Sequence, residues 1–172
     1  MKYTRIIILY LVYFITLTSW WEPGSSAASQ QQPDRQVSHL VQDGEFNRFW
    51  LQFRNCALNA PEQLTILVSS PLILRGELDG EAPKACNSDR LGPAWKTIMN
   101  KTVFAVDDHG KMVKITRRKF LQQQATLHRK MIQLAGENRL RVNDFVFIKN
   151  DRQWRLEMIY TDLEGVLCPA AP

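Results

Sequence analysis

The stretch FNRFWLQFRNCA, residues Phe46–Ala57, decides how the rest of the chain is expected to fold. Its large apolar side chains recur at intervals of three and four, which places them on one face of a helix. This face carries Phe46, Phe49, Trp50, Phe53 and Ala57. Each aromatic side chain would bury on the order of 150–250 Å². We therefore expect an amphipathic helix that packs its aromatic face on a broad apolar surface, such as a curved sheet.

The amino terminus has the organisation of an export signal. Lys2 and Arg5 give a positive region, residues 6–21 are almost all apolar, and small residues follow at 25–28. The apolar run is short for a spanning helix, which needs about 20 residues. We expect residues 1–27 to be a cleaved signal peptide that directs a periplasmic or secreted protein. The alternative is an uncleaved segment, through which alone the protein would contact a membrane.

The remaining chain has the length of one domain. The whole sequence has 172 residues, and one domain takes roughly 100–200 residues. Residues 28–42 are polar and lack periodicity, which predicts a flexible lead-in. Residues 43–164 are then a single domain, and residues 165–172 form a tail. The net charge of +5 is mild, and solubility explains it as well as an acidic partner does.

Shorter helices and strands are expected after the aromatic helix. Pro61 fits the first turn of a second helix, and Thr116 can cap a short helix over residues 117–124. A third helix is expected to place Leu91, Trp95, Ile98 and Met99 on one face. Residues 127–135 fit the helical and the strand period alike, so both alternatives stay open.

The end of the chain has the clearest β pattern. Residues 142–148 and 154–160 alternate between two faces, and Asn150-Asp151 can turn the chain between them. Asp144 is expected on an otherwise apolar strand face. The order of these elements predicts an α+β fold, in which amino-terminal helices pack into a strongly curved antiparallel sheet that closes with a carboxyl-terminal β-hairpin.

Three cysteines would meet an oxidising compartment after export. Cys56 lies beside the aromatic face of the first helix, as a buried free thiol does. Cys86 and Cys168 lie in loop-like, proline-containing surroundings. We expect these two to form a disulfide, which leaves Cys56 reduced.

Three segments resemble a known class of proteins: FWLQFRNCALNAPEQL, PLILRGELD and VNDFVFIKNDRQWRLEMIYTD. They are similar to exported bacterial proteins of no assigned activity within the nuclear-transport-factor-two-like class, which is a cystatin-like α+β cone. The resemblance covers most of residues 43–162, although Gln153 stands where a glycine-like turn residue would be expected. It implies that the helices fill a bent sheet, and that a pocket at its open end serves acid/base chemistry in some members.

The sequence carries few signs of catalytic or ligand-binding motifs. The sequence contains no GxGxxG, Walker-type, HExxH, CxxC or GxSxG pattern, so no cofactor is expected. The histidines have no metal-ligand spacing, so no metal site is expected. Asp144 is the one candidate for a catalytic carboxylate in a pocket, where desolvation would raise its pKa. The structural alternative is that Asp144 bonds to the backbone or to Arg155 on the paired strand.

Basic residues give the candidate binding surface. We select Arg75, Arg117, Arg118, Lys119 and Arg155. A nucleic-acid surface would need exposed aromatics between such charges. The aromatics here are expected in the core, so no nucleic acid is predicted. The remaining alternatives are an ordinary solvated face and a surface for an anionic partner.

These patterns favour a non-enzymatic binding or interaction module of the bacterial envelope, which takes a small apolar ligand or an envelope protein. One alternative is a small enzyme that uses a pocket carboxylate for proton transfer. Another is an inhibitor or immunity-type protein that acts through a surface contact. The volume and lining of a cavity would separate these alternatives.

Overall fold

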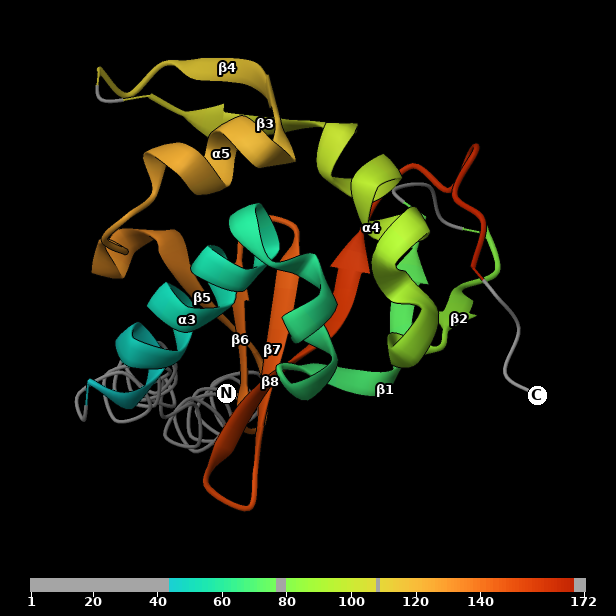
Figure 1. Ribbon diagram of the computed structural model, residues 1–172. Helices are drawn as coiled ribbons and strands as arrows, with labels where there is room; N and C mark the ends of the chain where they lie inside the picture. Colours follow the sequence, from blue (N-terminus) through green and yellow to red (C-terminus); the bar gives the residue numbers. More distant parts are fainter. Residues whose placement is uncertain (1–43, 77–79, 108, 169–172) are drawn as a thin grey trace, which may run out of the picture. The chain divides into compact units, whose positions relative to one another are not determined.

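The computed structural model describes residues 44–76, 80–107 and 109–168. In the described part, the first two helical segments precede the main sheet along the chain, and the others come between its second and third strands in sequence. Helices lie across the sheet, as Figure 1 shows. This arrangement confirms the predicted α+β class with helices packed on a curved sheet. The expected signal peptide and lead-in lie outside the described residues.

Three α-helices and three 3₁₀ helices are present in the described part. They are α3 (Glu45–Asn59), η3 (Pro61–Ile66), η4 (Ser88–Arg90), α4 (Leu91–Asn100), α5 (Arg117–Gln123) and η5 (Arg129–Met131). Thr116 Oγ1 accepts a hydrogen bond from the backbone N–H of Lys119, which is the N-cap expected for α5. Pro61 is the first residue of η3, where its missing N–H costs nothing. No described helix has the length and apolar character needed to span a membrane.

The described strands form one sheet of six and one hairpin of two. They are β1 (Val68–Arg75), β2 (Lys84–Cys86), β3 (Thr102–Val106), β4 (Met112–Thr116), β5 (Ile132–Gly136), β6 (Arg139–Val142), β7 (Phe145–Asn150) and β8 (Gln153–Tyr160). The large sheet has the order β2-β1-β8-β7-β6-β5, and β3 pairs with β4. For residues 127–135 the sequence left a helix and a strand as alternatives. The structure has the short 3₁₀ helix η5 there, followed by the strand β5, so each alternative describes part of the segment.

The aromatic face of α3 packs on β7 and β8. Phe46 meets Trp154 edge to face with ring centroids 4.8 Å apart, and Phe53 meets Phe147 at 5.3 Å. Edge-to-face contacts are the favoured geometry for aromatic pairs. Trp50 is almost fully buried, and its indole N–H donates to the carbonyl of Gln124 at 3.0 Å. The helix therefore fills the inner face of the sheet with rings, as its spacing predicted.

Two details of the sheet differ from the prediction. β1 runs parallel to β8, whereas the other pairs in the sheet are antiparallel. The last hairpin begins at Phe145, because Val142 belongs to β6 and a turn at 143–144 separates it from β7. Asp144 therefore lies in this turn and not on an apolar strand face.

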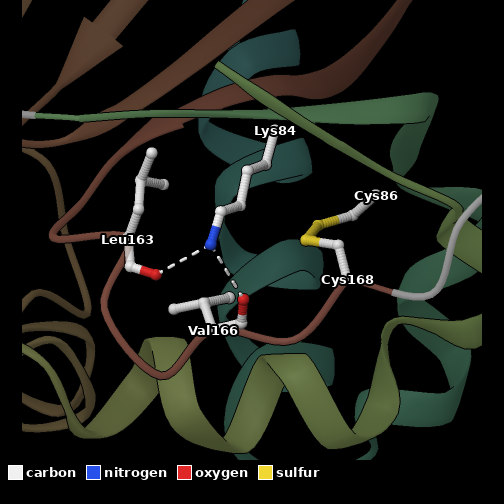
Figure 2. The surroundings of a disulfide bond; sticks show 5 residues. All are labelled: Lys84, Cys86, Leu163, Val166 and Cys168. Carbon is white, nitrogen blue, oxygen red and sulfur yellow. Dashed lines mark hydrogen bonds between the residues drawn. A yellow bond between two sulfur atoms is a disulfide. The ribbon is translucent and has the colours of Figure 1, made fainter. Parts of the chain in front are cut away.

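A disulfide joins Cys86 to Cys168, the pair that the sequence favoured, and Cys56 is a buried free thiol. Cys86 is fully buried in β2 and does not lie in the exposed loop that was expected. Figure 2 shows that Lys84 Nζ donates to the carbonyls of Leu163 and Val166 beside this bond, at 3.0 and 3.3 Å. The tail is therefore held against the domain as far as Cys168.

Candidate functional site

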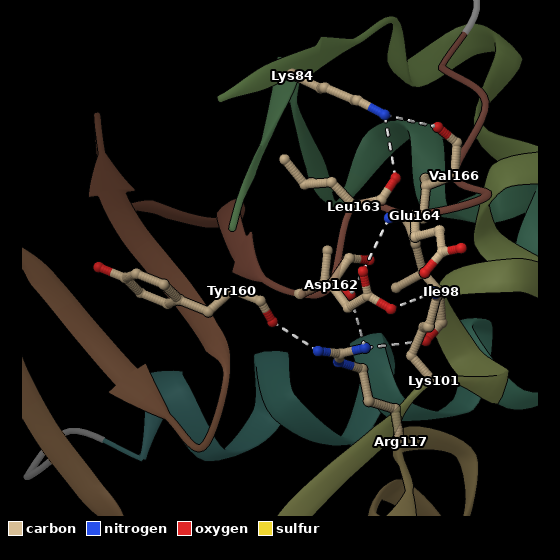
Figure 3. Close-up of polar contacts among 10 residues, drawn as sticks. Lys84, Ile98, Lys101, Arg117, Tyr160, Asp162, Leu163, Glu164 and Val166 are labelled. Carbon is tan, nitrogen blue, oxygen red and sulfur yellow. Dashed lines mark hydrogen bonds and ion pairs between the residues drawn. The ribbon is translucent and has the colours of Figure 1, made fainter. Parts of the chain in front are cut away.

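Arg117, the first residue of α5, has its side chain in the interior of the domain. The side chain is fully buried, whereas the sequence placed it on a basic surface. Nη1 donates to the carbonyl of Ile98 at 3.2 Å and to Thr161 Oγ1 at 3.0 Å, and Nη2 donates to the carbonyl of Tyr160 at 2.6 Å. Figure 3 shows the guanidinium among these groups. Arg117 thus joins the end of α4, the start of α5 and the end of β8, so it is not a surface ligand.

Asp144 is the carboxylate partner of this arginine. Its Oδ2 lies 3.0 Å from Arg117 Nη2, and its side chain is 19% exposed. The backbone carbonyl of Asp144 also accepts from the N–H of Tyr160 at 2.9 Å. The expected ion pair therefore exists, but its arginine is Arg117 and not Arg155, because the turn at 143–144 directs Asp144 toward α5.

A second ion pair lies close by. Lys101 Nζ donates to Asp162 Oδ2 at 2.6 Å. This hydrogen bond, together with one from the backbone N–H of Glu164 to Asp162, holds the pKa of the Asp162 carboxyl below its ordinary value. The charged side chains around Arg117 are therefore paired with one another. The bond between Lys101 and Asp162 holds the end of α4 against the end of β8.

Cys56 is a free thiol in the core. The side chain is buried, and burial raises the pKa of this thiol, with a smaller contribution from the charge of Glu62. A nucleophilic cysteine needs the opposite shift, because the thiolate is the reactive form. Cys56 is therefore a core residue.

A groove lies between the end of α3, η3 and α4. Its volume is about 440 Å³, within the range of small-ligand sites. Ala57, Trp95 and Met99 form a buried apolar floor, and Lys96 and Arg118 lie exposed at its rim. This combination provides an apolar surface with two positive charges beside it.

Hydrogen bonds fix the walls of this groove. Trp95 Nε1 donates to the carbonyl of Ala57 at 3.1 Å, which ties α4 to α3. Arg118 Nη2 donates to the carbonyl of Leu58 at 3.2 Å, which ties α5 to the same end of α3. These two bonds thus hold the indole of Trp95 and the guanidinium of Arg118 in place. Among the described residues, no group of three or more His, Cys, Asp or Glu could hold a metal.

The residues of the predicted basic surface are divided among four places. Arg117 is internal, Arg118 lines the groove, and Lys119 is exposed on α5. Arg75 and Arg155 are exposed on the main sheet, on β1 and β8. The sequence therefore identified one groove residue, Arg118, and missed Trp95 and Lys96. Trp95 is a buried core residue of α4, as the sequence predicted, and nothing in the sequence indicated that it also lies at the floor of a groove.

Comparison with known proteins does not assign a family. No protein-family model matches the sequence, and no curated protein matches it. A crystal structure described as a calcium/calmodulin dependent protein kinase II association domain from Xanthomonas campestris is similar. It has 11% sequence identity, a TM-score of 0.31, and coverage of 72% of this chain and 87% of that chain. A TM-score of this size carries no conclusion about function, so the α+β class rests on the helices and strands themselves.

Proposed function

We propose that this protein is a non-enzymatic binding module of the bacterial envelope. In this proposal, the groove between α3, η3 and α4 takes a small, largely apolar ligand that carries a negative charge. The observation that supports it most directly is the buried floor around Trp95 with Lys96 and Arg118 at the rim. Apolar walls with a few placed polar groups are typical of ligand sites.

The lining of the groove favours binding over proton transfer. None of the described residues that line it is an Asp, a Glu, a His or a Cys. General acid/base catalysis most often uses such a group within hydrogen-bond reach of the substrate, and Lys96, a lining residue that could also transfer a proton, lies exposed at the rim. The alternative enzyme would have to use Asp144, and that carboxylate accepts a hydrogen bond from Arg117.

The envelope location is supported by two features. The first is the export signal expected from residues 1–27. The second is the disulfide between Cys86 and Cys168, which is compatible with a periplasmic or extracellular location because such bonds persist in oxidising compartments.

The groove can be tested with an apolar anionic probe, 8-anilinonaphthalene-1-sulfonate. Gly92 lines the groove, and a Cβ added there would meet no atom within 4 Å. Gly92→Leu should therefore fill the groove without strain and abolish probe fluorescence. Lys96→Gln and Arg118→Gln should each weaken binding about two- to five-fold, the effect of one exposed ion pair.

Lys119→Gln is the matched control, because it removes one exposed positive charge from α5 outside the groove. Its affinity for the probe should equal that of the unmodified protein. Equal probe binding by Gly92→Leu and the unmodified protein would reject the groove as the ligand site.

A further inference from the structure

A second cluster of charged and aromatic side chains lies at one end of the main sheet. It consists of Arg75 on β1, Arg141 on β6 and Tyr160 on β8. We propose that these three side chains form an anion site that takes a phosphate group. The site is separate from the groove and does not depend on the function proposed for it.

The strand register places the three side chains on one face of the sheet. Arg75 lies directly opposite Tyr160, and Arg141 lies opposite Val146, which in turn lies opposite Met158. Directly opposed residues share a face, and residues two apart on a strand do as well. Met158 and Tyr160 are two apart, so the cluster lies on one face. The other face is the one that Phe145 and Phe147 present to the rings of α3.

Both guanidinium groups approach the ring of Tyr160. The central carbon of Arg141 lies 4.4 Å from the ring centroid, and that of Arg75 lies 5.9 Å from it. These distances are within the range of cation–π contacts. Figure 3 shows the ring of Tyr160 pointing away from Arg117 while its carbonyl points toward that residue. The buried contacts of Arg117 therefore fix the strand that presents the ring.

Arg141 is also held by its own hydrogen bond. Its Nε donates to the carbonyl of Asn143 at 2.7 Å. Asn143 has a φ of 53°, a left-handed conformation that Asn tolerates, and its side-chain amide donates to the carbonyl of Phe104 at 2.9 Å. This contact uses Nε, so the two terminal nitrogens of Arg141 are the groups that would donate to an oxyanion.

The charges at this end of the sheet are unbalanced. Arg139 on the same strand as Arg141 is paired with Glu157 through bonds of 2.7 and 2.9 Å, which raise the pKa of Arg139. Within the described ranges, no ion pair to a carboxylate involves Arg75 or Arg141. Asp144, in the turn beside Arg141, is paired with Arg117. Two positive charges thus lie beside one ring, and that of Arg141 is held in place by its bond to Asn143.

A phosphate group suits this arrangement better than a carboxylate. The oxygens of a phosphate are arranged tetrahedrally, so they point in more directions than the two coplanar oxygens of a carboxylate and can accept from donors on more than one side. The phosphate could belong to a free ion or to a lipid headgroup, whose phosphodiester keeps two non-bridging oxygens that accept hydrogen bonds.

The test uses the full chain in two binding assays. Calorimetry measures inorganic phosphate, and sedimentation measures vesicles of phosphatidylglycerol mixed with phosphatidylcholine. Arg141→Gln and Arg75→Gln should each weaken binding about ten-fold, because each loses hydrogen bonds to a charged group. Arg141→Lys keeps the charge without the fork and should not restore full affinity.

Arg155→Gln is the matched control, because Arg155 is an exposed arginine elsewhere on β8. Its affinity should stay within about two-fold of the unmodified protein. Binding of phosphate alone would assign a free phosphate ligand, and binding of vesicles alone would assign a lipid headgroup; either supports the site if the variants behave as stated. An equal loss in Arg155→Gln, or no binding in both assays, would overturn it. Unchanged melting temperatures exclude unfolding as the cause.

Discussion

Arg117 and Asp144 form an ion pair in which the arginine side chain is fully buried and the aspartate side chain is 19% exposed. The buried partner also donates to the carbonyls of Ile98 and Tyr160 and to the hydroxyl of Thr161. The charge is thus compensated by several acceptors from different parts of the chain. A buried charge without such partners would be strongly unfavourable.

Replacing this arginine should therefore destabilise the domain. In Arg117→Met the carboxylate of Asp144 and several buried acceptors lose their donor, and we expect a loss of about 3–5 kcal/mol in the free energy of unfolding. Urea denaturation measures the change. Lys119→Met is the control, because Lys119 is an exposed basic residue of the same helix, and its replacement should change the free energy of unfolding by less than about 0.5 kcal/mol. Equal midpoints for the two variants would refute the structural role of Arg117.

The aromatic packing of α3 gives a second prediction. Trp50→Ala removes a buried indole that packs on Phe53 and Phe147 and donates to the carbonyl of Gln124. We expect a loss of about 3–5 kcal/mol. Leu51→Ala, at an exposed position of the same helix, should have little effect. If Trp50→Ala kept its melting temperature and lost a ligand, the indole would be a binding residue and not a core residue.

The disulfide should contribute strongly to stability, because it links residues 82 positions apart. In the chain-entropy account, a loop of this length stabilises the folded state by about 4–5 kcal/mol. The double variant Cys86→Ala with Cys168→Ala should unfold at a correspondingly lower urea concentration. Reduction of the unmodified protein should give the same midpoint. A midpoint that does not respond to reduction would mean that the bond contributes nothing.

Two surface ion pairs predict weaker folding in acid. Lys149 hydrogen-bonds Glu45 at 2.5 Å and Lys101 hydrogen-bonds Asp162 at 2.6 Å, and these bonds lower the pKa of both carboxyls. A lowered folded-state pKa adds stability that is complete above the unfolded-state pKa of about 4 and is lost as pH falls through the folded-state value.

Melting temperatures measured across this acidic range provide the test. A Glu45→Gln and Asp162→Asn double variant should lose stability less steeply on acidification than the unmodified protein, because it lacks both titrating groups. Parallel curves for the two proteins would show that these pairs do not contribute.

The features predicted from sequence are the locally encoded ones. The three-and-four spacing of Phe46, Phe49 and Trp50 predicted α3, and the side-chain chemistry of Thr116 predicted the start of α5. These signals lie within a few residues of the feature that they specify, so a single sequence is enough to read them.

The features that were missed depend on distant parts of the chain. Arg117 stands in a run of three basic residues, which reads as a solvated surface, and its burial depends on acceptors at residues 98, 144, 160 and 161. The parallel pairing of β1 with β8 joins strands from opposite ends of the domain. The groove likewise needs three elements at once, and no local period encodes it.

The bond between Cys86 and Cys168 also makes a closed covalent loop of the chain that contains α4, α5 and the strands from β3 to β8. Cutting any one peptide bond within that loop opens it but does not divide the molecule, since the two fragments stay joined through sulfur. A protease that cleaves the turn between β3 and β4 would therefore produce a nicked protein of unchanged mass apart from one water. Such a domain can be cut once within the loop without losing either half.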